Sequence, residues 1–180
     1  MSSISDLTPG TWNVDPSHTV IGFTARHLMI SKVRGRFTSF TGSVTIAEDP
    51  LQSTVEATVD LGSVTTGDEA RDGHLKSGDF FDVENHPTMT FRSTGIKADG
   101  DDFLLTGDLT VAGKTRSVDF ELEFDGVTQD PWGGTRAGFS AETEISRKDW
   151  ELTWNVALET GGVLVGDKVK IELDVELVKA

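Results

Sequence analysis

Four histidines are the side chains of this sequence best suited to metal or acid–base chemistry: His18, His27, His74 and His86. No two of them have the His-x-His or His-x-x-x-His spacing that presents two nitrogen ligands on one side of a strand or helix. The chain also lacks cysteine, which removes thiolate ligands, disulfides and cysteine nucleophiles. We therefore expect no native metal site, because only folding could gather these histidines.

Nucleophilic catalysis has little support in the sequence. Ser17 and His18 are adjacent, but no nucleophile-elbow motif surrounds the serine. Asp79 and Asp82 flank two aromatic residues and have no nucleophile or base beside them. We predict no catalytic residue. The alternative is a small isomerase or hydrolase in which a histidine or carboxylate does acid–base work inside an apolar cavity.

Two pairs of opposite charges could instead contact a ligand headgroup: Arg71 with Asp72, and Arg147 with Asp149. An unpaired charge beside an apolar cavity would be costly, whereas a paired and hydrogen-bonded one is tolerated. We therefore favour a structural role for both pairs, in which ion pairs and loop hydrogen bonds fix irregular segments to the rest of the fold.

The segment Gly67–Phe91 positions the first pair and interrupts a chain that otherwise alternates apolar and polar residues. Its first part, 68–76, predicts a short helix with acidic residues at its start and Ser-Gly after its end. Phe80 and Phe81 then stand between two carboxylates, a pattern typical of a segment that covers an apolar surface. We predict a lid in which one of these rings faces inward and the other packs near Leu75.

The remaining chain predicts an all-β fold. Thr11–Val14 is a short extended segment, Phe37 and Phe40 differ in parity and indicate a bend near Ser39, and 27–30 is an apolar run that could cap a barrel mouth. An irregular apolar segment, 150–164, is predicted to form a second flap. Eight antiparallel strands favour a closed barrel, although periodicity alone also fits a sandwich. The predicted strands are 18–26, 35–47, 54–61, 88–97, 102–111, 115–125, 135–146 and 166–178.

Composition limits the classes of partner. The chain has 180 residues without a linker-like stretch, which predicts a single domain over residues 1–180. Its net charge of −14 disfavours binding to nucleic acid or to an anionic bilayer surface by simple electrostatics. The first residues lack the charge and apolar run of a signal peptide, and no later run has the length of a membrane span. We expect a cytoplasmic protein without an integral membrane segment.

The inward faces of the predicted strands are rich in phenylalanine, which fits either a filled core or a ligand cavity. The lid favours the cavity, since a filled barrel needs no long insertion with paired aromatic residues. The ligand would be apolar and elongated, with few polar groups to orient it. The candidate ligand-binding residues are Ile21, Phe23, Phe37, Phe40, Leu75, Phe80, Phe81, Met89, Phe91, Phe120, Phe139, Trp150 and Trp154.

Several blocks of the sequence resemble the YceI-like family: WNVDPSH at 12–18, VRGRF at 33–37, ARDGHLKSGDFFDVENHPTMTF at 70–91, GDLTVAG at 107–113 and ISRKDW at 145–150. The resemblance implies a lipocalin-like barrel that binds a polyisoprenoid or similar long-chain lipid, with no other cofactor. It favours binding or carriage of a polyprenyl chain, isoprenoid quinone or similar lipid. It also implies a homodimer, in which we expect some of Trp132, Trp150 and Trp154 to meet the partner. Many members resemble exported proteins, unlike this chain.

Overall fold

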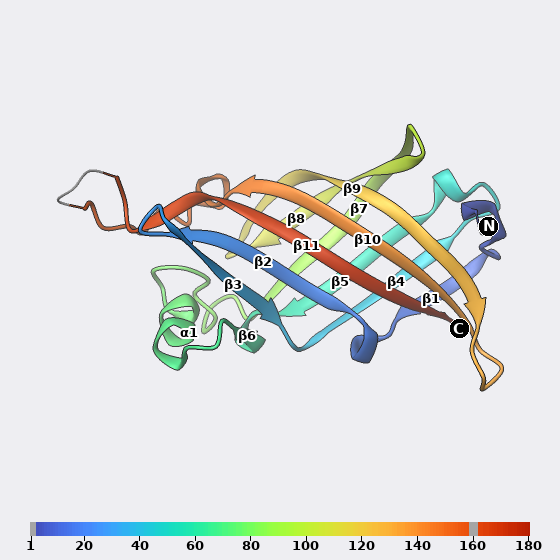
Figure 1. Cartoon of the computed structure of the whole chain (residues 1–180), viewed down its shortest axis with the longest axis horizontal. Coiled ribbons are helices and arrows are strands. Elements are labelled where there is room, and N and C mark those ends of the chain that lie inside the picture. The colour runs from blue at the N-terminus through green and yellow to red at the C-terminus, as the bar shows by residue number, and fades with distance from the viewer. Residues whose placement is uncertain (1–2, 159–161) are drawn as a thin grey trace.

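The computed structural model describes residues 3–158 and 162–180 and consists of β-strands with one short α-helix (Figure 1). Every strand pairing in it is antiparallel. The elements are β1 (Gly10–Val14), β2 (Val20–His27), β3 (Ser31–Phe37), β4 (Phe40–Ile46), β5 (Thr54–Asp60), β6 (Val64–Thr65), α1 (Glu69–Lys76), β7 (Thr88–Asp99), β8 (Asp102–Val111), β9 (Lys114–Gln129), β10 (Thr135–Ser146) and β11 (Val165–Lys179).

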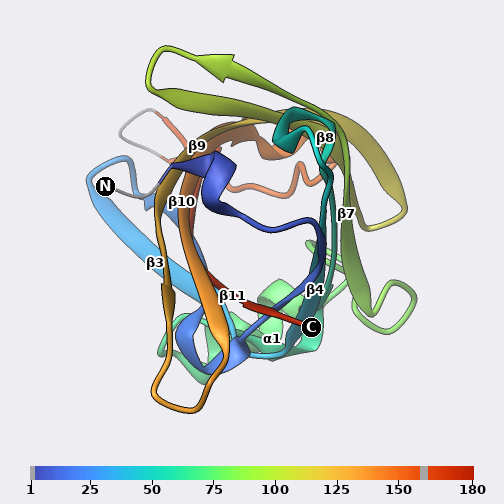
Figure 2. The ribbon, with the colours of Figure 1, turned by 90° about the vertical axis from the view of Figure 1, so that its right-hand side faces the viewer.

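Eight of these strands form a closed ring in the order β1, β4, β5, β7, β8, β9, β10 and β11. The ring closes where Trp12, Asn13 and Val14 of β1 pair with the last residues of β11. Figure 2 shows this ring end-on, with the first residues of the chain crossing its near end. The predicted eight-stranded antiparallel barrel is therefore confirmed.

The other three strands, β2, β3 and β6, branch from the ring at β11. The edge of β11 pairs with β1 near its C-terminal end and with β2 over Val165–Asp174. Along the chain, β1 leads into β2, β3 into β4, and β5 into β6, so each pair is one long strand with a break. The short helix α1 lies beside β6, at the left of Figure 1, and covers the edge that would otherwise stay open.

The break between β3 and β4 confirms the bend predicted near Ser39 and shows that the strand predicted at 35–47 is two strands. Ser63, in the break between β5 and β6, holds this bend because its hydroxyl oxygen accepts from the Thr38 and Ser39 amides at 3.1 and 3.0 Å. Adjacent strands therefore break side by side, which creases the wall of the barrel.

Two sequence predictions need correction, and a third agrees with the described part of the chain. Residues 27–30 do not cap a barrel mouth, because they form the hairpin turn between β2 and β3. The segment Thr11–Val14 belongs to β1, a full member of the ring. The predicted flap at 150–164 starts within the 3₁₀ turn Arg147–Trp150 and continues as irregular chain, and its residues 159–161 lie outside the described part.

The lid helix forms as predicted. The Asp68 carboxylate accepts a hydrogen bond from the Arg71 amide at 3.1 Å and caps α1. Ser77 ends the helix in an extended conformation.

At eight residues α1 is the longest helix described, so no helix in that part of the chain has the length and apolar character needed to cross a bilayer.

The glycine at position 107 makes room for an aromatic ring of the core. A Cβ at Gly107 would lie 2.3 Å from the Phe91 Cζ and 2.7 Å from the Arg92 carbonyl oxygen. Gly95, across the same strand pair, has nothing within 4 Å of such an atom. The two glycines of this hairpin therefore have different packing constraints.

We expect Gly107→Ala to lower the free energy of unfolding by about 1–3 kcal/mol, because the Phe91 ring must leave its site over the strand. Gly95→Ala, the matched control, should change it by less than about 0.5 kcal/mol. Denaturant unfolding of both variants checks this. Equal stability of the two would show that the ring moves at no cost.

Candidate functional site: the barrel cavity

The barrel contains a partly open cavity of about 190 Å³. It runs from the N-terminal 3₁₀ turn, where Ile4 and Leu7 cover one end, to the middle of the barrel at Val59 and Phe91. Its wall comes from the inward side chains of the ring strands and of the start of β2. The wall residues include Val14, Ile21, Val44, Ile46, Val55, Ala57, Ile96, Leu105, Leu109, Leu122, Ala141, Ile171, Leu173, Val175 and Leu177.

The lining is almost free of polar groups. Among the described residues only Thr19, Thr41, Ser53 and Glu56 contribute a polar side chain to it. The Glu56 carboxylate points to solvent, because its side chain is 62 % exposed and pairs with Arg92 at 3.2 Å. Such a surface suits an apolar, elongated molecule and offers nothing to orient a polar one.

Six of the thirteen residues predicted to bind ligand line this cavity. They come from β2, β4, β7, β9 and β10, the strands whose alternation predicted inward side chains. These six are Ile21, Phe40, Met89, Phe91, Phe120 and Phe139. The other seven lie outside the cavity lining, in the lid end of the barrel: Phe23, Phe37, Leu75, Phe80, Phe81, Trp150 and Trp154.

A cluster of side chains, which we call the plug, fills the barrel under the lid. The Phe37 ring lies at its centre, 5.6 Å from the Phe23 ring and 6.0 Å from the Phe81 ring. Leu75 of α1 packs on the same cluster, and Leu61 in it is fully buried. The cavity was expected between the inward strand faces and the lid, but this packing closes it off below the lid.

Phe80 and Phe81 lie on opposite sides of the lid, as predicted. Phe81 packs inward on the plug, whereas Phe80 lies 5.1 Å from the His74 ring and 5.5 Å from the Trp154 ring. The outward ring therefore packs against the lid helix at His74, the residue before Leu75, as predicted. The cause differs from the prediction, because these residues form a tight turn and not an extended segment, with Asp82 at a φ of 52°.

The three predicted tryptophans of the dimer interface have different surroundings. Trp150 is 3 % exposed, and its indole N–H donates to the Leu109 carbonyl at 2.9 Å, so it belongs to the core. Trp154 packs its ring 4.5 Å from the His74 ring. Trp132 is 82 % exposed, in the loop between β9 and β10. The homodimer stays a prediction, and Trp132 is the tryptophan of this set with a free face.

Three of these four charged residues have structural partners, in agreement with the structural role that we favoured, but the Asp149 side chain makes no ion pair or hydrogen bond with the described residues. The Asp72 carboxylate accepts from the Thr66 amide and hydroxyl at 2.8 and 2.6 Å, and Arg71 donates to the Thr66 hydroxyl and carbonyl oxygens at 2.7 and 3.0 Å. These bonds tie α1 to the end of β6.

Arg147 organises the irregular segment before β11. Burial lowers the pKa of its guanidinium, and Asp167 at 3.7 Å opposes this shift. The nearest carboxylate is thus Asp167 and not the predicted Asp149. The guanidinium donates to four backbone carbonyls, those of Leu152, Trp154, Val165 and Gly166, at 2.5–3.3 Å.

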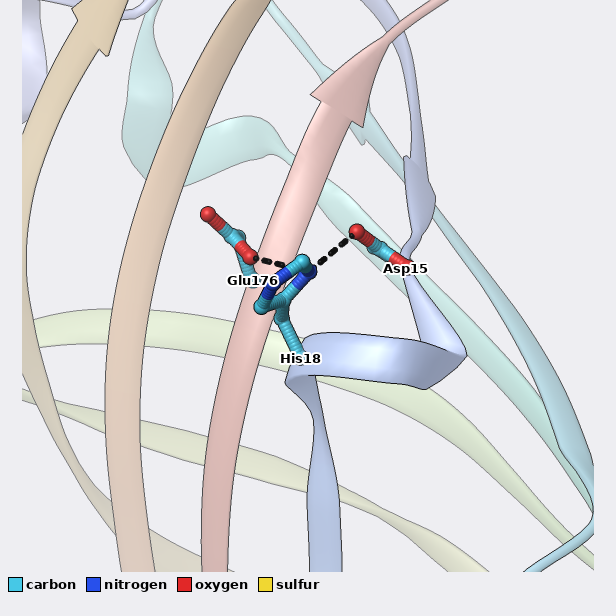
Figure 3. A group of neighbouring side chains, drawn as sticks. All are labelled: Asp15, His18 and Glu176. Carbon is cyan, nitrogen blue, oxygen red and sulfur yellow. Dashed lines mark hydrogen bonds and ion pairs between the residues drawn. The ribbon is translucent and has the colours of Figure 1, made fainter. Parts of the chain in front are cut away.

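Folding gathers one histidine into a cluster of charges at the point where β11 changes partner from β1 to β2. The His18 Nδ1 lies 2.8 Å from Asp15 Oδ2 and 3.2 Å from Glu176 Oε2, as Figure 3 shows. Arg136 bridges the same carboxylates and also Asp130, at 2.7, 3.7 and 2.9 Å. The His18 and Arg136 hydrogen bonds hold the pKa of Asp15 far below its usual range.

This cluster is poorly suited to metal binding and to serine catalysis, the two chemistries that its residue types suggest. A metal ion bound by Asp15, His18 and Glu176 would compete with the Arg136 guanidinium, which already neutralises both carboxylates. In a Ser-His-Asp triad the serine and the aspartate contact different ring nitrogens. Here both Ser17 and Asp15 contact His18 Nδ1. The cluster is a set of ion pairs that joins neighbouring strands, and we call Asp15, His18, Arg136 and Glu176 the charged lock.

A scan against protein-family models matches residues 12–177 to the YceI-like domain. The chain belongs to the YceI-like family. The YceI protein of Escherichia coli O17:K52:H18 is 43 % identical over 155 residues, which cover 84 % of this chain and 81 % of that protein. A UPF0312 protein of Pseudomonas aeruginosa is 43 % identical over 136 residues, covering 75 % and 71 % of the two chains.

Solved structures share this YceI-like fold. The Campylobacter jejuni YceI protein aligns with a TM-score of 0.72 at 28 % identity, covering 86 % of this chain and 90 % of that one. Burkholderia cenocepacia BcnA aligns with a TM-score of 0.74 at 24 % identity, covering 91 % and 98 %. A polyisoprenoid binding domain from Saccharophagus degradans aligns with a TM-score of 0.72 at 16 % identity, covering 96 % and 100 %.

Sequence reasoning on this YceI-like chain missed the cavity residues contributed by the N-terminal segment. Ile4 and Leu7 are apolar residues three apart in a polar stretch, and Ser3 and Asp6 form a capping box around them. A capping box next to apolar residues is a recognisable helix start. This signal could have identified a short turn that covers the barrel end.

The stabilising contribution of His18 should depend on pH. Asp15 first, and then Glu176, raise the pKa of His18 above its usual value of 6.5. A raised histidine pKa stabilises the fold fully below the unfolded pKa, and this contribution is lost as the pH rises through the folded pKa. We expect His18→Gln to lower the melting temperature more at pH 6 than at pH 9, measured by thermal melts in a constant salt concentration. An equal effect at both values would mean that His18 acts only by packing.

The two lid phenylalanines should differ in their effect on stability. Phe81→Ala leaves a cavity in the plug and should cost about 2–4 kcal/mol. Phe80→Ala removes ring contacts at the surface of the lid and should cost about 1 kcal/mol. Urea unfolding of the two variants checks this, and a larger loss for Phe80→Ala would contradict the inward placement of Phe81.

Proposed function

We propose that this protein binds an isoprenoid-type lipid, such as a polyprenyl chain or an isoprenoid quinone, in the barrel cavity. The observation that carries the proposal is a partly open cavity of about 190 Å³ lined by inward aliphatic and aromatic side chains of the eight ring strands. An apolar chain gains from leaving water for such a surface without needing a polar partner.

The comparisons support the same class of ligand. The Saccharophagus degradans neighbour is a polyisoprenoid binding domain, and it covers nearly all of this chain. At 16 % identity the likeness carries the fold, so the ligand of this chain is argued from its own cavity. The YceI-like family model spans residues 12–177, so it covers the barrel and the lid segment together.

The alternative, an enzyme acting on a small apolar substrate, needs a titratable group inside the cavity. Neither His27 nor His74 is among the described lining residues. Glu56, the titratable residue that does contribute to the wall, has its carboxylate on the outside with Arg92. These positions favour binding or carriage over catalysis.

A variant that narrows the bore tests the proposal. Ala57 lines the cavity, and its neighbour Thr58 is exposed on the outer face of β5. We expect Ala57→Leu to fold and to bind a polyprenol or an isoprenoid quinone at least about tenfold more weakly, because the added methyl groups occupy space that the chain needs. Titration with these lipids and mass spectrometry of organic extracts measure the loss.

Thr58→Leu is the matched control, since it adds a leucine to the same strand on the solvent side. It should bind as the parent does, and both variants should keep the parent's far-UV circular dichroism. If Ala57→Leu carries the same lipid in the same amount as Thr58→Leu, the ligand does not lie in this cavity and the proposal fails.

A further inference from the structure

The hairpin formed by β2 and β3 reverses the charge pattern of the protein. Although one residue in six of the whole chain is acidic, residues 16–47 contain neither Asp nor Glu. The same stretch contains four cations, Arg26, Lys32, Arg34 and Arg36. A local positive segment in a chain with a net charge of −14 calls for an explanation.

The strand register places all four cations on the outer face of the hairpin. Arg26 pairs with Lys32, Thr24 with Arg34, and Gly22 with Arg36, and directly paired residues point to the same side. The alternate side is the inner one, since Ile21 lines the cavity. The four cations are therefore presented to solvent together.

These cations have no partner of their own within residues 3–158 and 162–180. Among the described residues, no ion pair or hydrogen bond involves the side chain of Arg26, Lys32, Arg34 or Arg36, and all four are exposed. On the next strand, by contrast, Lys170 pairs with Glu142 at 3.6 Å. Arg26 directly opposite Lys32 is a like-charge pair, which destabilises a hairpin in water.

The turn of this hairpin carries large apolar side chains in water. Leu28, Met29 and Ile30 are 38, 53 and 81 % exposed. Leu28 and Met29 have φ angles of 54° and 63°, the left-handed conformation for which Asn and Gly are favoured in hairpin turns. The turn thus keeps two bulky residues in a strained conformation, although both side chains stay partly exposed in the isolated protein.

The apolar surface continues beyond the turn. The Leu28 amide donates to the Leu164 carbonyl at 2.8 Å, and the Leu164 amide donates to the Val156 carbonyl at 2.9 Å. Val156 is itself 47 % exposed. The tip of the hairpin and this loop lie together at the left end of the barrel in Figure 1, on the side of α1.

We infer that the β2–β3 hairpin docks the lid end of the barrel on a bilayer that contains anionic lipids. The apolar tip enters the boundary between headgroups and acyl chains, while the four cations face the lipid phosphates. A nucleic acid would pair with the cations but would leave the apolar tip in water. A lipid surface accounts for both the cations and the apolar tip. This docking does not depend on what the cavity holds.

The net charge of −14 does not prevent this docking. At physiological salt a charge is screened beyond about 8 Å, whereas a strand of 12 residues such as β10 extends about 40 Å. The hairpin therefore acts as a local positive charge. The acidic remainder of the barrel is repelled by the anionic membrane, which orients the hairpin toward it. The argument from net charge applies to the whole molecule and not to this face.

Co-sedimentation of the delipidated full chain with vesicles tests the inference. We expect binding to phosphatidylcholine vesicles with about one quarter phosphatidylglycerol at about 0.1 M salt, and loss at about 1 M, where the Debye length falls to about 3 Å. Vesicles of phosphatidylcholine alone should bind far less. Absence of binding to the anionic vesicles at low salt overturns the inference.

Two pairs of variants separate the charge from the apolar tip. Lys32→Gln with Arg34→Gln should weaken binding roughly thirtyfold, whereas Arg92→Gln with Lys97→Gln removes the same charge from β7, across the ring from β11, and should leave it within about twofold. Ile30→Ser should weaken binding at least about tenfold. Trp132→Ser removes an equally exposed side chain, 82 % against 81 %, and should not.

Equal losses in the hairpin and control variants would overturn the docking site. So would an Ile30→Ser variant that binds vesicles as the parent does but changes its sedimentation mass, because the tip would then be an interface between two copies of the chain. Thermal melts of each variant keep a folding defect distinct from a binding defect. The cavity experiment has its own readout, so either proposal can fail alone.

Discussion

The shape of this barrel depends on the edge of β11, which pairs with two different strands. Near its C-terminal end it pairs with β1 and closes the ring, and over Val165–Asp174 it pairs with β2. At the junction the Glu176 carbonyl accepts from the Asp15 amide at 2.9 Å. The Glu176 amide donates to the buried Thr19 hydroxyl at 3.1 Å. A buried backbone amide or carbonyl without a hydrogen-bond partner is costly. These hydrogen bonds therefore fix the turn between β1 and β2 in place on β11.

The charged lock of Asp15, His18, Arg136 and Glu176 stands at the same junction, so the side chains reinforce what the backbone begins. The consequence reaches the cavity. On the side of the junction that faces the N-terminal 3₁₀ turn, the closed ring surrounds an apolar bore. On the lid side, β2, β3 and β6 turn away from the ring and leave a space that the plug and α1 fill. The crease in the wall therefore separates the apolar cavity from a packed lid end.

The two ends of the barrel consequently have different chemistry. The N-terminal end is covered by the apolar residues Ile4 and Leu7 of a single 3₁₀ turn. The lid end combines aromatic packing with Arg147, whose guanidinium donates to two carbonyls of the irregular segment and to two carbonyls at the start of β11. It also presents the basic hairpin with its apolar tip. This arrangement keeps the bore apolar and places the charged and exposed apolar groups outside it. It suits the lipid binding that we propose, since the protein must also stay folded when no lipid is bound.

The sequence by itself determined the class of fold and the inward side chains, because a period of two sets the face of every residue once a strand forms. That is why Ile21, Phe40, Met89, Phe91, Phe120 and Phe139 were identified correctly as facing inward. It also determined the lid helix, through its cap and its break in periodicity. The tertiary structure alone decided that Phe23, Phe37 and Phe81 pack into a plug and not around the bore, since periodicity gives the face of a residue but not its height along the barrel. Pairing of β11 with both β1 and β2, and the meeting of His18 with Glu176 across 158 residues, are likewise long-range contacts that no local pattern encodes.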